Sequence, residues 1–127
     1  MTSVSKKIII VEDQPAVADL LEEMLSLDNY QVLKIHSSGS GLSVIRAEKP
    51  DLVLLDIMMP DVSGLEVLRF MRREPDLRQI PVVIVSAKTL PADIRDGLDA
   101  GATAYLTKPV DVNTLRETVA QVIREVE

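Results

Sequence analysis

The chain has 127 residues, no cysteine and a formal net charge of −6. The lack of cysteine excludes disulfides, thiolate metal sites and cysteine nucleophiles, and the acidic charge argues against sequence-independent binding to nucleic acid. The longest apolar runs fall far short of the roughly 20 residues that a membrane span needs and no secretory signal is evident, so we expect a cytoplasmic protein with one domain over residues 1–127.

Strand-like and helix-like patterns alternate five times along the chain. Short apolar runs predict strands at residues 8–11, 30–35, 52–55, 81–85 and 104–106, and the first of these runs is wholly β-branched. Apolar residues at helical spacing predict helices at residues 15–28, 38–47, 64–73, 91–100 and 111–126. Asp13 and Pro15 suit the first turn of the first helix, and Gly101 suits the end of the fourth. This alternation predicts a parallel sheet with helices on both faces.

Polar side chains follow four of the five predicted strands. They are Glu12 and Asp13, then Asp56, then Ser86, then Lys108. In an open α/β sheet these strand ends meet at one edge, where ligands bind. The three carboxylates and one ammonium group give the set a formal charge of −2. Crowded carboxylates resist ionisation unless a cation joins them, and Mg²⁺ prefers oxygen ligands. The pattern therefore indicates metal-assisted phosphoryl chemistry on an aspartate.

The chain closely resembles the receiver domain of two-component response regulators over essentially its full length. The resemblance rests on VED at residues 11–13, LDIMMP at 55–60 with Gly64 after it, SA at 86–87 and YLTKP at 105–109. It implies a flavodoxin-like (βα)5 three-layer α/β sandwich with a five-stranded parallel sheet in the order 2-1-3-4-5, for which this family is already a reference example.

The resemblance assigns the acidic residues to phosphoryl transfer. Asp56 would be the phosphoacceptor, a carboxylate nucleophile. Mg²⁺ would be bound by Asp13, Asp56 and the main-chain carbonyl of Met58, with Glu12 acting through water or through neighbouring ligands. Taken alone, Asp56 is equally well explained as a loop aspartate before a turn, and Asp13 as a helix cap.

The resemblance also assigns the residues that would respond to phosphorylation. Ser86 and Lys108 would contact the phosphoryl oxygens, and the ring of Tyr105 would change position with Ser86. Met58 and Lys88 would border the site and tune hydrolysis. Taken alone, Ser86 is explained as a strand-end serine, Lys108 as a surface lysine and Tyr105 as a tyrosine packed at a sheet edge. The resemblance further implies a cis peptide between Lys108 and Pro109.

By resemblance, the protein is a phosphorylation-driven switch and not an enzyme, because it would catalyse only its own phosphorylation and dephosphorylation. The donor would be a sensor histidine kinase or a histidine phosphotransfer protein. The fourth helix, fifth strand and fifth helix, roughly residues 91–126, would then bind a downstream effector or dimerise. We therefore expect a monomer or a phosphorylation-dependent dimer.

Three other functions remain to be weighed. A flavodoxin-like electron carrier shares the fold, but Glu12 and Asp13 stand where it needs a phosphate-binding loop. An aspartate-nucleophile phosphatase usually has a second acid two residues after the nucleophile, where this chain has Met58. A receiver-like module that has lost phosphorylation is the third, and the complete acidic set argues against it.

Overall fold

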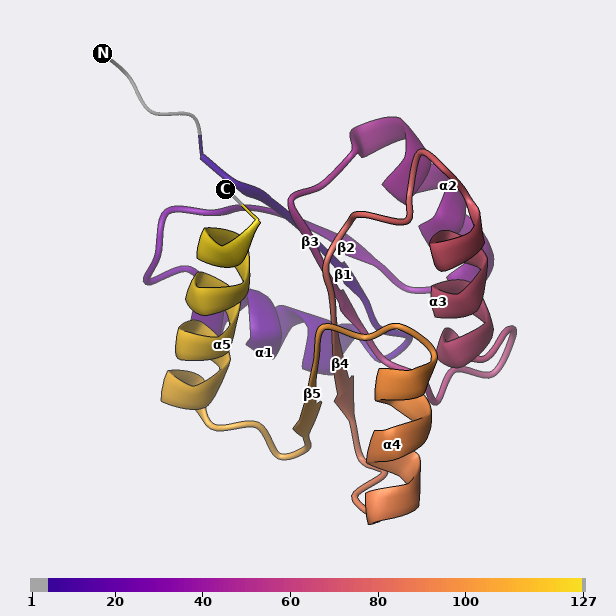
Figure 1. Ribbon diagram of the computed structural model, residues 1–127. Coiled ribbons are helices and arrows are strands. Elements are labelled where there is room, and N and C mark those ends of the chain that lie inside the picture. The colour runs from indigo at the N-terminus through magenta and orange to yellow at the C-terminus, as the bar shows by residue number, and fades with distance from the viewer. Residues whose placement is uncertain (1–4, 127) are drawn as a thin grey trace.

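Five parallel strands form the middle layer of the molecule (Figure 1). The computed structural model describes residues 5–126. The strands are β1 (Lys7–Val11), β2 (Gln31–Ile35), β3 (Leu52–Leu55), β4 (Val82–Ser86) and β5 (Ala104–Thr107). Their order is β2-β1-β3-β4-β5, and each neighbouring pair is parallel. This confirms the predicted topology.

Helices cover both faces of the sheet. They are α1 (Pro15–Leu25), α2 (Ser38–Glu48), α3 (Gly64–Arg73), α4 (Pro91–Asp99) and α5 (Val112–Glu125). α1 and α5 pack on one face, and α2, α3 and α4 lie on the other (Figure 1). The central strands β1, β3 and β4 are buried on both faces, which explains their continuous apolar runs. Within residues 5–126, every helix is too short or too polar to cross a bilayer.

α1 begins at Pro15, as predicted, but its C-terminal end differs from the prediction. The helix ends at Leu25 and not at residue 28, because the Ser26 hydroxyl and the N–H of Asp28 bond to preceding carbonyls and form turns. Gln14 is the N-cap and no side chain caps the helix. The interpretation of Asp13 as a helix cap is therefore wrong, and its carboxylate remains available for another role.

The C-terminus of α4 agrees with the prediction. Gly101 has φ = +114°, a conformation that glycine adopts without the steric cost of a Cβ atom. The N–H of Ala102 reaches back to the carbonyl of Gly97 at 3.1 Å, so the chain reverses there towards β5.

The loop between β3 and α3 is tied to the N-terminus of α2. The carboxylate of Asp61 accepts hydrogen bonds from the N–H groups of Ser38 and Gly39, at 3.0 and 3.2 Å. The Ser38 hydroxyl donates to the carbonyl of Val62 at 2.6 Å. The N–H of Gly39, followed by other main-chain donors, lowers the pKa of Asp61. The loop is thus held by β3 where it begins and by hydrogen bonds from α2 at Asp61 and Val62.

Candidate functional site

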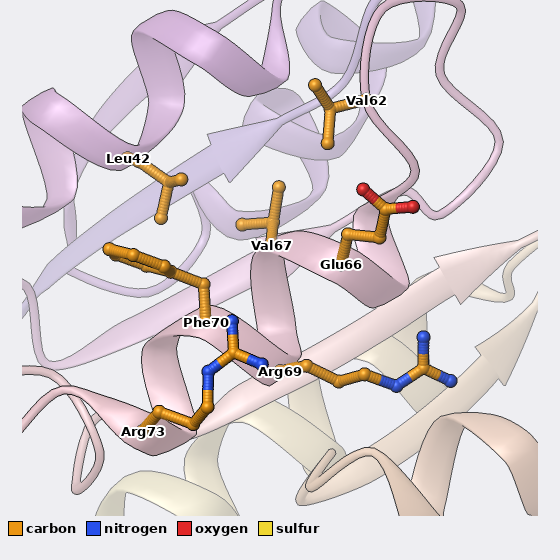
Figure 2. A pocket seen from close by; sticks show the side chains of 7 residues that line it. All are labelled: Leu42, Val62, Glu66, Val67, Arg69, Phe70 and Arg73. Carbon is orange, nitrogen blue, oxygen red and sulfur yellow. The ribbon is translucent and has the colours of Figure 1, made fainter.

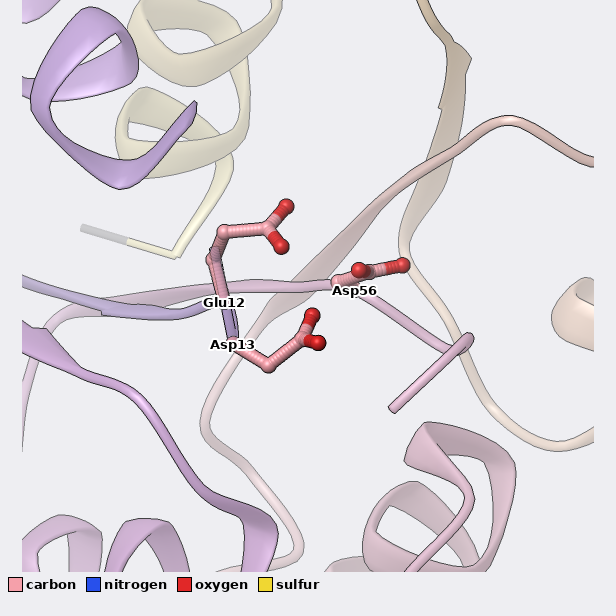
Figure 3. Close-up of side chains that lie close together, drawn as sticks. All are labelled: Glu12, Asp13 and Asp56. Atoms are coloured by element: carbon pink, nitrogen blue, oxygen red, sulfur yellow. The ribbon is translucent and has the colours of Figure 1, made fainter. Parts of the chain in front are cut away.

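Carboxylates from two neighbouring strands meet at the carboxyl edge of the sheet (Figure 3). Glu12 and Asp13 follow β1 and Asp56 follows β3, and these strands pair with Val11 beside Leu55. One oxygen of each carboxylate lies within 4.8 Å of the other two. Glu12 and Asp56 are 1% and 5% exposed, whereas Asp13 is partly exposed and gives the group access to solvent.

This donor set fits Mg²⁺. The ligand atoms are hard carboxylate oxygens, and Mg²⁺ keeps several of its waters, so a few protein ligands at one open edge are enough. Two of the three carboxylates are buried, and buried like charges at this separation favour a bound cation. The residues present therefore suit the ion that the sequence suggests.

Lys108 supplies the positive charge at this edge. Its Nζ lies 2.7 Å from Glu12 Oε1 and 3.5 Å from Asp56 Oδ2, and the peptide that joins it to Pro109 is cis, as predicted. Burial alone would lower the pKa of Lys108, but the hydrogen bond to Glu12 and the charge of Asp56 raise it. Burial raises the pKa of Glu12, and Lys108 only partly offsets this effect. The ammonium group therefore stays protonated beside Asp56.

The backbone around Asp56 fixes its orientation. The N–H of Met58 donates to Asp56 Oδ1 at 3.0 Å, and the side chain of Met58 is 50% exposed. α3 begins directly against this segment, because a Cβ atom on Gly64 would lie 2.6 Å from the Cα atom of Ile57. One oxygen of Asp56 is thus held by the backbone, and the other lies on the side of Lys108.

Ser86 and Tyr105 are connected through the main chain of Lys88. The Ser86 hydroxyl is fully buried and accepts a hydrogen bond from the N–H of Lys88 at 3.1 Å. The Tyr105 hydroxyl donates to the carbonyl of Lys88 at 2.8 Å. Burial raises the pKa of Tyr105, and the nearby Ser86 hydroxyl opposes this shift. Among residues 5–126, no hydrogen bond joins the Ser86 hydroxyl to a carboxylate of the site.

Similarity to known proteins decides the family. Residues 8–120 match the response regulator receiver domain. The chain belongs to the response regulator receiver family. It is therefore a receiver domain of two-component signalling. Membership confirms the predicted resemblance, and it decides against the flavodoxin-like electron carrier and the aspartate-nucleophile phosphatase.

Relatives of this receiver are similar along nearly their whole length. Protein PilH of Pseudomonas aeruginosa is 41% identical over 117 residues, which cover 92% of this chain and 97% of PilH. The polar-differentiation response regulator DivK of Brucella ovis is 34% identical over 115 residues, or 91% of this chain and 94% of DivK.

Solved structures show the same fold. A CheY-like receiver domain from Methanospirillum hungatei has a TM-score of 0.88 and 31% identity, and covers 97% of each chain. The receiver domain of a signal transduction histidine kinase from Syntrophus aciditrophicus has a TM-score of 0.89 and 30% identity, covering 97% of this chain and 93% of that one.

The receiver brings most of the predicted site residues together. Glu12, Asp13, Asp56 and Lys108 form one group, whereas Ser86 lies at the adjacent strand end and contacts Lys88. Sequence reasoning missed that Glu12 is the nearest partner of Lys108, 96 residues along the chain. It also missed the hydrogen bonds between the loop after β3 and the start of α2, for which a single sequence carries no signal.

Proposed function

We propose that this receiver accepts a phosphoryl group on Asp56, transferred in the presence of Mg²⁺ from a phosphohistidine on a sensor kinase or phosphotransfer protein. The observation that carries the proposal is the position of Lys108, whose Nζ lies 3.5 Å from Asp56 Oδ2 at the edge where three carboxylates converge. A nucleophilic carboxylate, a cation site and a fixed ammonium group are the parts that in-line phosphoryl transfer needs.

The chemistry follows from the orientation of Asp56. A carboxylate oxygen attacks the phosphorus, an O–P bond forms, and the N–P bond of the donor breaks so that its imidazole leaves with the electron pair. Asp13, Asp56 and the Met58 carbonyl, with Glu12 through water, would hold the Mg²⁺, which neutralises charge on the phosphoryl oxygens. Lys108 already faces Asp56, so its ammonium group can contact the new oxygens with little movement.

Signalling then depends on the bridge through Lys88. If the Ser86 side chain rotates to place its hydroxyl against a phosphoryl oxygen, the hydrogen bond that its oxygen accepts from the N–H of Lys88 changes as well, and the carbonyl that holds Tyr105 belongs to the same residue. A modification shifts a population only by interacting differently with the two states. Nearly complete switching needs on the order of 5 kcal/mol of such difference.

The surface expected to change is α4-β5-α5, which includes Tyr105 and ends near residue 126. We propose that it binds a downstream effector protein in the cytoplasm, or pairs with a second copy once phosphorylated. The whole of residues 1–127 then acts as one switch, with no activity on an external substrate.

Phosphorylation can be tested with acetyl phosphate and Mg²⁺, followed by intact-mass measurement. We expect the addition of one phosphoryl group, which disappears with a chelator or in Asp56→Ala. Asp99→Ala is the matched control, because it removes an exposed carboxylate from α4. Phosphoryl addition that persists in Asp56→Ala would rule out Asp56 as the acceptor.

The lifetime of the phosphorylated form tests the role of Met58. Its side chain borders the acceptor and is half exposed, and a thioether is too weak an acceptor to position an attacking water. We expect Met58→Asn to change the rate of self-dephosphorylation, measured as the decay of the phosphorylated mass. An unchanged decay rate would count against this role.

A further inference from the structure

A pocket lies between α2 and α3 (Figure 2), and none of its lining residues belongs to α4, β5 or α5. Its apolar lining comes from Leu42 of α2, from Val62 of the loop before α3, and from Phe70 of α3. Arg69 and Arg73 line one side, and Glu66 lies near Val62 (Figure 2). Val62 is 37% exposed, so the pocket presents apolar surface to solvent beside two cationic groups.

The two arginines of this pocket are unpaired in the part of the chain that the structure describes. Within residues 5–126, neither Arg69 nor Arg73 makes a hydrogen bond or an ion pair. Two carboxylates that follow α3 in the sequence, Glu74 and Asp76, pair instead with Arg46 at 2.8 and 3.0 Å. Arg46 of α2 also lies over the ring of Phe70, 5.8 Å from its centroid. One face of the ring is therefore covered by this arginine.

The stability of α3 does not explain this arrangement. Arg69 and Arg73 are four residues apart on one helix, and like charges at that spacing destabilise a helix by about 0.2–0.5 kcal/mol. Arg73 lies in the last turn, where a cation is favourable, but Arg69 lies further from the C-terminus. The pocket lining holds Arg69, Arg73 and one carboxylate, Glu66, so its formal charge is +1 in a chain whose net charge is −6.

We propose that this pocket docks an acidic amphipathic segment of a partner protein. One apolar side chain of the segment would pack on Leu42, Val62 and Phe70, while its carboxylates pair with Arg69 and Arg73. Charge complementarity selects this occupant, because the guanidinium group matches a carboxylate with two parallel hydrogen bonds. The net charge of −6 would repel an acidic segment from most of the protein surface. Binding of such a segment is therefore expected only beside Arg69 and Arg73.

Hydrogen bonds connect the pocket to the loop between β3 and α3, which follows Asp56. Val62 lies in the loop that follows Asp56, and its carbonyl accepts from Ser38 at the start of α2. Asp61 holds the same loop to α2. The docking proposal does not depend on phosphorylation of Asp56, and it is tested on the unmodified protein.

The test uses two synthetic helical peptides and the full chain labelled with ¹⁵N. Both peptides carry leucine at every third or fourth position, and they differ only in having glutamate or lysine at the remaining positions. We expect the glutamate peptide to bind saturably and to shift the amide signals of Leu42, Val62 and Phe70. The lysine peptide should not bind there. Affinity should fall as salt is added, because exposed charges are screened.

Charge-reversal variants decide whether the pocket is responsible. In Arg69→Glu/Arg73→Glu the Kd for the glutamate peptide should rise by about tenfold or more. Arg95→Glu/Arg124→Glu is the matched control, because it makes the same change of charge on α4 and α5, and there the Kd should change by less than about twofold. Thermal unfolding of each variant checks that the fold is retained.

Three results would overturn the proposal. The first is equal binding of the two peptides, and the second is shifted amides on another surface. The third is self-association of the protein alone, measured by sedimentation, that is lost in Arg69→Glu/Arg73→Glu. In that case the occupant is a second copy of this chain and not a partner's acidic segment.

Discussion

Two helices on the same face of the sheet, α3 and α4, are held in very different ways (Figure 1). α3 fully buries Val67, Leu68 and Met71, and the Ser63 side chain caps its first turn. In α4 only Gly97 is fully buried, and no side chain caps the N-terminus. Leu90 and Leu98, at the two ends of α4, are 66% and 46% exposed.

The difference separates a fixed part of the receiver from an adjustable one. Each buried side chain of α3 stabilises its position by about 1.5–3 kcal/mol, and α3 begins against the backbone that carries Asp56. α4 lacks this anchorage and faces the ring of Tyr105 through Gly97. Elements that move in signalling are drawn from the weakly held parts of a fold, and α4 fits that description better than α3.

The largest expected effect tests the anchorage directly. Met71→Ala in α3 should lower the free energy of unfolding by about 3 kcal/mol, because it leaves a cavity in a fully buried position. Leu98→Ala in α4 should change it by less than about 0.5 kcal/mol, because that side chain is half exposed. Urea denaturation monitored by circular dichroism measures both. Equal losses in the two variants would remove the distinction between the helices.

A second substitution tests how α4 contacts Tyr105. A Cβ atom at Gly97 would lie 2.8 Å from both Ile84 Cδ1 and Tyr105 Cδ2, so Gly97→Ala should displace the ring or the helix. The steric cost of 1–3 kcal/mol exceeds the gain of about 1 kcal/mol in helix propensity. We expect a net loss of about 1 kcal/mol.

The position of the ring can be measured separately from stability. In a Tyr30→Phe background Tyr105 is the only tyrosine, and Gly97→Ala should make its fluorescence easier to quench with acrylamide. In a Tyr105→Ala background the loss of stability should be smaller but not abolished, because the contact with Ile84 remains. Quenching that stays the same would show that the ring does not rest against Gly97.

The smallest effect concerns acid, which should weaken the attachment of the loop before α3. The pKa of Asp61 is lowered by N–H donors at the start of α2, so its stabilising contribution is fully present above an ordinary aspartate pKa of about 3.9. It is lost as the pH falls through the lower pKa of the folded protein. Asp61→Asn should therefore flatten the pH dependence of unfolding below about pH 4, from the ordinary aspartate pKa down to the lower pKa of the folded protein.

A carboxyl titration by NMR supplies the direct check on Asp61. Its midpoint should lie below that of an unfolded aspartate, and Asp99→Asn serves as the matched substitution on α4. A titration of Asp61 at or above the ordinary aspartate pKa would contradict the capping contact.

The sequence is sufficient to predict the elements of this fold but not all their ends. Continuous apolar runs locate β1, β3 and β4 within about a residue, because strands buried on both faces leave no ambiguity of pattern. The first helix was placed three residues too long. Its apolar period continues to Leu25, and the turn beyond it depends on a local bond of the Ser26 hydroxyl, which periodicity does not report.

The candidate site shows a similar limit. Its residues are recognisable because each follows a strand, and parallel strands bring those positions to one edge. Their individual contacts cannot be predicted from the sequence. Lys108 could face any of three carboxylates, and only the packed structure shows that it contacts Glu12. Gly64 is a further example, since the need for a missing Cβ atom arises from the backbone of Asp56 and Ile57 pressed against it.

The bridge between Ser86 and Tyr105 consists of the peptide groups of residue 88, and the lysine side chain takes no part in it. Any amino acid except proline provides that N–H and that carbonyl. The side chain at residue 88 can therefore be substituted without removing the hydrogen bonds that connect Ser86 to Tyr105.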